Sequence, residues 1–431
     1  MSALINIHHA MLQVWSFQWL VAAATLLPAL TFVIYRSPSP CPIPGIPHNT
    51  NLGLLGDLPE LWRWQSQTQQ VFNFYTSHFE KLDSPIVQLF VRPFRRPCVF
   101  VSDPDVTEDT LTRRGDEFDR SALFGDLLNG IVPYNHARLP TNKQMRAQRR
   151  LLSDTMSPHF LRSIIAPRTR QAVLELVDLW KRKTELAGPD CALEAYKDMQ
   201  HAGLDALWAA TFMTELDASR SQQDYLSRPE LVIEKPSRGR VIFPKPPLPS
   251  ISVFLNRILA TSEEIIASPS PKQHHWVLRQ FPRMRAMYRT LGAALKEAMD
   301  AAIIQASSGD ADARSVAELV YRRSDAKMMP REVIRDELLG FIAAGHDPPA
   351  MTLAWGVVFL ADHGDVQTRL RDDLYEAFGD QELPSADAIS AAQIPYLDAC
   401  IEETLRAGTS QAGVSRVTTR DTELMGYWIP K

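Results

Sequence analysis

Apolar residues recur at helical spacing over most of the chain, and β-like runs are few. Residues 84–103 contain two such runs, Ile86–Val91 and Cys98–Val101, with prolines between them. After this segment helical patterns dominate and the closing residues 415–431 predict short strands and a turn. Helices are expected within 137–156, around 168–184 and 193–216, and at 283–305, 364–378 and 395–407. The pattern predicts a mainly α fold with a minor β-sheet.

The longest helical pattern covers residues 329–364, "MPREVIRDELLGFIAAGHDPPAMTLAWGVVFLADHG". At 1.5 Å per residue this helix is roughly 50 Å long, so it must cross its whole domain. Pro330 suits a first-turn position and Gly364 a stop. Pro348 and Pro349 stand in its middle, where each proline costs roughly 3 kcal/mol in an ordinary helix. These prolines therefore need a local structure that lowers their usual cost.

The N-terminal residues have a different pattern. No Lys, Arg, Asp or Glu occurs before Arg36, and residues 19–35 alone would span about 25 Å as a helix. A cleaved signal peptide is the competing interpretation, but the segment has no basic start and its apolar run is too long. Residues 1–36 are therefore predicted to be a single-pass membrane anchor, with the body on the cytosolic side because charge follows only the C-terminal end.

A Pro-rich hinge, residues 37–50, follows the anchor and begins "SPSPCPIPGIP". No second linker long enough to separate two domains appears after it, so residues 51–431 are predicted to form one domain. Residues 236–250, "PSRGRVIFPKPPLPS", predict a loop without regular structure.

Composition and charge narrow the class of protein. The 431 residues are 45% hydrophobic and 22% charged, which is typical of a globular protein. The net charge of −4 gives no argument for nucleic-acid binding. The four cysteines (Cys41, Cys98, Cys191 and Cys400) are far apart and form neither a disulfide framework nor a zinc motif.

Single motifs carry little weight. Glu403 and Arg406 in "EETLR" stand three residues apart, as in many exposed helical pairs. Arg149 in "RAQRRLL" would by default belong to a solvated basic face, and His346–Asp347 could be a satisfied polar pair.

Their order and separation are more specific. An apolar anchor, a Pro-rich hinge, "RGDEFDRS" (114–121) and "QMRAQRRLL" come first. A long helix with A-G-x-D, an E-x-x-R helix, an arginine ten residues later and "DTELMGYWIPK" follow. This series resembles the cytochrome P-450 superfamily of heme-thiolate monooxygenases, and is most similar to its fungal membrane-bound members. The resemblance implies a cytochrome P-450-like fold, a heme cofactor, and electrons from NADPH through a reductase.

The resemblance also implies roles for individual residues. Arg149 and Arg416 match arginines that bind the heme propionates, for which a planar, permanently charged guanidinium is suited. Ala344 and Gly345 match positions where the long helix approaches the iron-bound oxygen. The resemblance makes Glu403 and Arg406 a buried structural ion pair. It makes Asp347 the catalytic acid that relays protons.

The chain departs from the family pattern in three places. Met145 stands where the family has a tryptophan. Pro348 and Pro349 replace two hydroxyl residues that normally follow the acid, so the relay loses its side-chain hydroxyl. The resemblance implies a helix that is already kinked at this point, where a proline fits at less than its usual cost. The axial cysteine loop of the family follows the "IPKG" turn, and the given sequence ends within that turn. No metal ligand is therefore expected among the residues given.

Three functions follow as hypotheses. The first is a heme-dependent monooxygenase that oxidises a lipophilic small molecule in secondary-metabolite biosynthesis, anchored in the endoplasmic reticulum membrane with its body cytosolic. The second is a truncated, inactive remnant without the thiolate. The third is a heme enzyme of rearrangement or dehydration type, which would not need the proton-relay threonine.

Overall fold

The structure is a computed structural model. It describes residues 41–50, 53, 55–92, 95–189, 191–229, 231, 233, 239–266, 268–307, 313–323, 328–379, 383–408 and 413–431. The predicted anchor (1–36) and the first part of the hinge (37–50) lie outside these residues. Among the helices that the structure does describe, none combines the length and the apolar character needed to cross a membrane.

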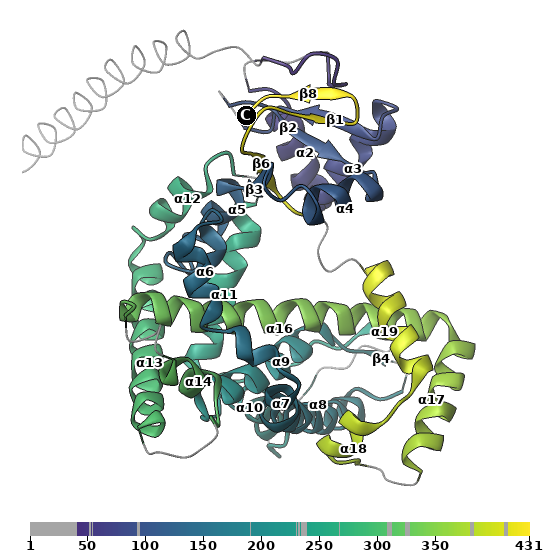
Figure 1. Ribbon diagram of the computed structural model, residues 1–431. Helices are drawn as coiled ribbons and strands as arrows, with labels where there is room; N and C mark the ends of the chain where they lie inside the picture. The colour runs from purple at the N-terminus through teal and green to yellow at the C-terminus, as the bar shows by residue number, and fades with distance from the viewer. Residues whose placement is uncertain are drawn as a thin grey trace, which may run out of the picture. The chain divides into compact units, whose positions relative to one another are not determined.

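The chain forms two compact units. Unit 1 comprises the residues up to Phe118 together with Thr418–Lys431, and unit 2 comprises Asp119–Val417. The predicted domain of residues 51–431 includes parts of both units. The described residues are mainly helical with small two-stranded sheets, as the sequence pattern predicts (Figure 1).

Unit 1 joins the early strands to the end of the chain. Its elements are α2 (Leu58–Thr68), α3 (Val71–Lys81), β1 (Ile86–Leu89), β2 (Cys98–Val101), α4 (Pro104–Thr112), β7 (Thr422–Leu424) and β8 (Tyr427–Ile429). β1 and β2 pair antiparallel, with Ile86 opposite Val101. The two predicted strand runs are thus confirmed, although β1 ends two residues early.

A polar cluster in unit 1 explains part of the "RGDEF" motif. The Arg114 guanidinium binds the Glu117 carboxylate at 2.6 Å and the Thr422 hydroxyl at 2.6 Å. Arg420 reaches the same carboxylate at 2.9 Å. Hydrogen bonds from Thr422, Arg114 and Arg420 lower the pKa of Glu117 to about 2. The motif therefore fastens β7 to the segment that precedes β3.

Unit 2 is a helical body. Its first helices are α5 (Ala122–Leu128), α6 (Lys143–Arg150), α7 (Pro158–Phe160), α8 (Ala166–Ala187), α9 (Tyr196–Phe212), α10 (Ala218–Leu226), α11 (Ser250–Ile265) and α12 (Pro271–Leu278). They are followed by α13 (Pro282–Ala306), α14 (Val316–Arg322), α16 (Arg331–Asp362), α17 (Gly364–Phe378), α18 (Ala386–Ala391) and α19 (Pro395–Gly408). Short 3₁₀ turns occur at His136–Arg138 and Ser153–Met156, and a π turn at Leu161–Ile165.

Besides the sheet of β1 and β2, the described residues form three further two-stranded sheets. β3 (Phe118–Arg120) pairs with β6 (Arg416–Thr418), and β7 with β8. β4 (Cys191–Ala192) pairs in parallel with β5 (Gly239–Arg240). The prediction of a loop without regular structure at 236–250 is wrong at Gly239 and Arg240, because their backbone forms β5 and completes this small sheet.

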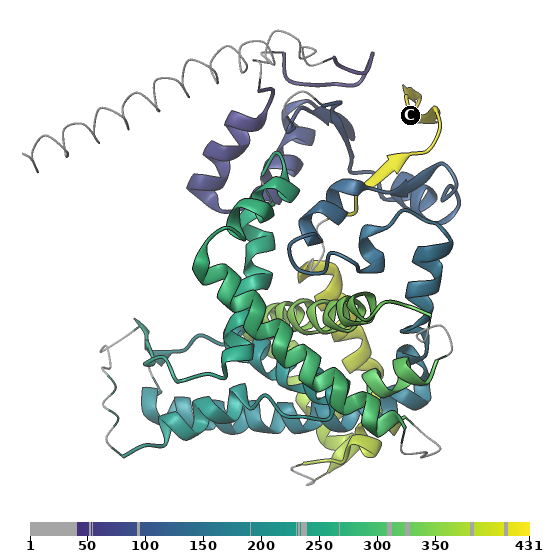
Figure 2. The ribbon, with the colours of Figure 1, turned by 90° about the vertical axis from the view of Figure 1, so that its left-hand side faces the viewer.

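Helix α16 is the central element of unit 2, as expected from its apolar pattern. It packs along α9, which lies beneath it in Figure 1, and Figure 2 looks along its axis. The largest hydrophobic core lies among α9, α11, α13, α14 and the first half of α16, with Phe212, Leu255 and Leu338 fully buried. Burial of this core, at about 25 cal/mol per Å² of apolar surface, stabilises the unit.

The two prolines do not interrupt α16. The helix runs without a break from Arg331 to Asp362, with Pro348 and Pro349 inside it and both exposed. The N–H groups that the prolines lack would have bonded the carbonyls of Ala344 and Gly345. Ala344 is itself exposed, so this side of the helix is accessible one turn before Pro348.

Candidate functional site: an arginine cluster beside a central helix

Three arginines from distant parts of unit 2 act on one another. Arg120 ends β3, Arg149 lies in the last turn of α6, and Arg416 opens β6. Burial lowers the pKa of Arg120, and the positive charges of Arg149 and Arg416 lower it further, against the opposing charge of Asp119. Arg149 and Arg416 therefore lie close enough to Arg120 for their charges to act on it, and Asp119 is the carboxylate that opposes them.

The cluster has cationic groups left for a ligand. Within the described residues Arg149 makes no side-chain hydrogen bond or ion pair, and Arg416 binds only the carbonyl of Ser415, at 3.1 Å. Asp119 is occupied by the backbone N–H groups of Thr141 (3.1 Å to each oxygen) and Arg120 (2.7 Å). Mutually repelling guanidinium groups with few counter-charges fit a ligand that carries two carboxylates. Heme, with its two propionates, is such a ligand.

Local structure fixes the position of Arg149. Asn142 caps α6 by accepting a hydrogen bond from the backbone N–H of Met145 at 2.8 Å. Met145 and Gln148 are buried, whereas Arg149, one helical turn after Met145, is exposed. Met145, at the family's tryptophan position, packs as an ordinary core residue.

Arg120 is the member of the cluster that the sequence analysis did not predict as a heme ligand. The sequence did hold a hint of its importance, because Arg120 belongs to the segment "RGDEFDRS" that carries part of the family resemblance. What the sequence did not show is that β3 pairs with β6 and so places Arg120 beside Arg416, almost 300 residues later.

Asp347, the predicted catalytic acid, points toward α9. Its Oδ1 accepts hydrogen bonds from the Tyr196 hydroxyl at 2.8 Å and from the Gln200 amide at 2.5 Å. The neighbouring His346 is buried, and its Nδ1 lies 3.0 Å from the carbonyl of Ile342, to which it donates. Burial lowers the pKa of His346, which favours the neutral ring.

Ala344 and Gly345, the predicted cofactor contacts, lie on different sides of α16. Ala344 is exposed, as is Pro348 one turn later. A Cβ on Gly345 would come within 2.8 Å of Leu207 Cδ1 on α9. The structure therefore gives Gly345 a packing role between the two helices, and leaves Ala344 on the accessible face.

Glu403 and Arg406 form the predicted ion pair on α19. Arg406 Nε and Nη2 bind the two carboxylate oxygens at 2.7 and 2.6 Å, a bidentate arrangement. The two side chains are 62% and 71% exposed, whereas the resemblance implies a buried pair. The physical reason is that α19 is covered only where it packs on α16 and α17, and no described residue covers the side that carries this pair. An exposed pair of this kind contributes little to stability.

Apolar side chains are exposed next to this pair. Gly408 lies against Trp355, where a Cβ would approach the Trp355 Cβ to 2.9 Å. The second half of α16 and the outer side of α19 carry apolar residues that are about half exposed: Leu353, Trp355, Val357, Val358, Ile401 and Leu405. This surface is suited to apolar ligands or apolar protein segments.

The cysteines show no sign of a prepared thiolate. Burial raises the pKa of both Cys98 and Cys400, which disfavours the charged form that binds iron. No group of three His, Cys, Asp or Glu side chains suitable for a metal occurs among the residues that the structure describes.

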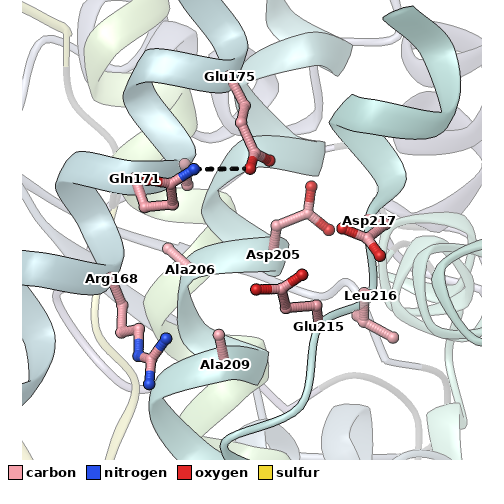
Figure 3. A pocket seen from close by; sticks show the side chains of 10 residues that line it. Arg168, Gln171, Glu175, Asp205, Ala206, Ala209, Glu215, Leu216 and Asp217 are labelled. Carbon is pink, nitrogen blue, oxygen red and sulfur yellow. Dashed lines mark hydrogen bonds between the residues drawn. The ribbon is translucent and has the colours of Figure 1, made fainter. Parts of the chain in front are cut away.

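A small cavity elsewhere in unit 2 is lined by acidic residues (Figure 3). Asp205 accepts hydrogen bonds from the backbone N–H groups of Ala218 and Ser219 at the start of α10. Glu175, Glu215 and Asp217 all pair with Arg220. One guanidinium thus serves three carboxylates. None of the predicted site residues lines this cavity.

Comparison with known proteins identifies the family. Residues 47–431 match the family model described as Cytochrome P450. The chain is 32% identical over 432 residues to cytochrome P450 monooxygenase GME11363 of Pestalotiopsis microspora, covering 95% of this chain and 75% of that protein. It is 29% identical over 429 residues to cytochrome P450 monooxygenase TRI13 of Fusarium sporotrichioides, covering 93% and 72%. A shorter match, 37% over 114 residues, covers 26% of this chain and 22% of human cytochrome P450 4F3.

The chain therefore belongs to the cytochrome P450 family, and the protein is an enzyme of that type. The resemblance stated from the sequence motifs is confirmed.

Proposed function

We propose that the protein is a heme-dependent monooxygenase that inserts oxygen into a lipophilic small molecule in fungal secondary metabolism. The observation that carries the proposal is the cluster of Arg120, Arg149 and Arg416, which fits the propionates of heme. Heme, when bound, supplies the activation of molecular oxygen with electrons from NADPH through a reductase. The relatives named above are cytochrome P450 monooxygenases, two of them from fungi, which supports the same reaction class.

The residues of this chain have separate roles in the proposal. Arg149 and Arg416 bind carboxylates of the cofactor and fix its orientation. The accessible face of α16 that includes Ala344 and Pro348 would shield a bound cofactor from water. Asp347 holds a proton for delivery, and its Oδ1 is fixed by donors from α9.

Reconstitution tests the proposal. The purified full chain, supplied with hemin and with NADPH and a reductase, should convert members of a lipophilic compound panel to products that contain one atom from ¹⁸O₂. Product with ¹⁸O from water, or product formed without NADPH, would contradict a monooxygenase.

A second candidate is a heme enzyme that rearranges or dehydrates its substrate. Pro348 favours it, because no side-chain hydroxyl follows Asp347 in α16. Such an enzyme would form product without NADPH and without isotope incorporation, so the same assay separates the two.

We further propose a single-pass anchor within residues 1–36 that places the protein in the endoplasmic reticulum membrane with its body cytosolic. The charge-free sequence before Arg36 supports this. Extraction of membranes with alkaline carbonate should leave the protein in the pellet, and release into the supernatant would contradict the anchor.

A further inference from the structure

Asp347 is held by a neighbouring helix rather than by its own. Both hydrogen bonds to Oδ1 come from α9, from the Tyr196 hydroxyl (2.8 Å) and the Gln200 amide (2.5 Å). No hydrogen bond to Oδ2 is found among the residues that the structure describes. One oxygen of the acid is therefore fixed, and the other is left for a further partner.

The packing of α9 against α16 sets the position of the tyrosine hydroxyl. The ring of Tyr196 packs against a buried cluster that includes Met199 and Ala202 on α9 and Ala350 on α16. Small residues bring the two helices together, since a Cβ on Gly203 would lie 3.2 Å from the His346 carbonyl oxygen. Because the ring is fixed by apolar contacts, its hydroxyl meets Asp347 in a defined place.

The residue after Asp347 makes this contact significant. Pro348 carries neither a hydroxyl nor an N–H, so the residue that follows the acid offers it no proton donor. Tyr196 is an O–H group that both donates and accepts, and it is only partly buried near the start of α9. Gln200 can donate its amide hydrogens but cannot pass a proton on.

We propose that Tyr196 gives Asp347 the hydroxyl partner that residue 348 does not provide, and that Gln200 holds the carboxylate in place. The inference rests on the proposed monooxygenase function. When Asp347 gives up a proton from Oδ2, the Tyr196 hydroxyl donates its proton to Oδ1. The tyrosine oxygen takes a proton from water in turn, so the proton count balances. Both α9 residues act through Asp347 and are positioning residues.

The first part of the test needs no cofactor. A double-mutant cycle with Tyr196→Phe and Asp347→Asn in the full chain measures the contact by denaturant unfolding. If the charge-assisted hydrogen bond exists, the effects of the two single substitutions will not add up to the effect of the double substitution. The difference should correspond to about a ten-fold change in the unfolding equilibrium constant. Tyr225→Phe is the matched control, because Tyr225 also lies on a helix of unit 2 and its ring packs under the guanidinium of Arg228, far along the chain from Asp347. Additive effects would overturn the contact.

The second part separates proton transfer from packing. In the heme-loaded enzyme, Tyr196→Phe should lower the product formed per NADPH about ten-fold or more and change its solvent isotope effect. Adding Pro348→Thr to Tyr196→Phe should restore much of the loss, because it returns a hydroxyl next to Asp347. A Tyr196→Phe enzyme as well coupled as the wild type, or one that Pro348→Thr does not rescue, would overturn the inference. Wild type that forms no oxygenated product would instead contradict the proposed function, while the unfolding cycle would still decide the contact.

Discussion

His136 donates to Glu337 twice: its backbone N–H lies 2.6 Å from Oε1 and its Nδ1 lies 2.6 Å from Oε2. The carboxylate can only accept, so Nδ1 must carry the hydrogen. The Asn135 amide donates to Oε2 as well, at 3.1 Å, and Glu337 is fully buried on α16. These bonds fasten the turn before α6, and so the helix that carries Arg149, to the central helix.

Glu337→Ala should therefore lower the free energy of unfolding by about 3 kcal/mol, because the buried Asn135 amide and two donors of the half-buried His136 lose their acceptor. Glu332→Ala is the control, since Glu332 is exposed in the first turn of the same helix and should change stability by less than about 0.5 kcal/mol. Urea unfolding followed by circular dichroism measures both. Equal stability of the two variants would show that the contact contributes nothing.

Gly130 should tolerate no side chain. A Cβ there would lie 1.8 Å from His275 Nδ1 on α12, and the same ring donates through Nε2 to the Leu127 carbonyl at 2.7 Å. Arg279 also binds the Gly130 carbonyl at 2.6 Å. Gly130→Ala should thus displace α12 and destabilise the protein by about 1–3 kcal/mol.

Gly292→Ala provides the matched control for this substitution. Gly292 lies inside α13 with open space around its Cα, so alanine should raise stability by up to about 1 kcal/mol. Thermal unfolding should show a lower melting temperature than wild type for Gly130→Ala and a higher one for Gly292→Ala. A Gly130→Ala protein as stable as the wild type would mean that α12 does not pack on this turn.

His201 should make stability depend on pH. Burial and the nearby charges of Lys183, His346 and Lys197 lower its pKa to about 4 from the ordinary 6.5. The folded state disfavours the protonated ring, so this contribution is fully present above pH 6.5 and is lost as the pH falls from 6.5 toward 4. The loss amounts to about 3 kcal/mol.

His201→Gln should flatten the stability profile between pH 6.5 and 4, whereas the exposed His159→Gln should leave it unchanged. Burial also lowers the pKa of His275 and His346, so some slope will remain in the variant. Denaturant unfolding at half-unit pH intervals gives the profile. If the free energy of unfolding depended on pH in the same way in wild type and in His201→Gln, His201 would not be a buried neutral imidazole.

The sequence predicted the parts of this molecule that local patterns control. The helices at 168–184, 283–305, 364–378 and 395–407 appear within a few residues of their expected bounds, because apolar spacing and caps are local signals. Arg149 and Arg416 could be predicted as propionate ligands because each stands at a fixed place in a motif of the family. The kink that the resemblance implies in α16 stays a prediction, while the helix itself continues through both prolines, which are exposed.

Contacts between distant segments could not be predicted. Tyr196 meets Asp347 across 151 residues, and nothing near either residue signals the other. Arg120 meets Arg416 through the pairing of β3 with β6, a contact between segments far apart in the chain. The exposure of Glu403 and Arg406 depends on which elements cover α19, a property of the assembled fold.

The central claim is that Arg120, Arg149 and Arg416 bind the propionates of heme, and titration of the full chain with hemin and with hemin dimethyl ester tests it most directly. The diester lacks both negative charges, so wild type should bind hemin about ten-fold more tightly or better. Arg149→Gln and Arg416→Gln should each reduce the ratio of the affinity for hemin to the affinity for the diester. Arg146→Gln should leave this ratio unchanged, because Arg146 is not among the charges that act on Arg120. Equal affinity for hemin and its diester, unchanged in all three variants, would contradict the account.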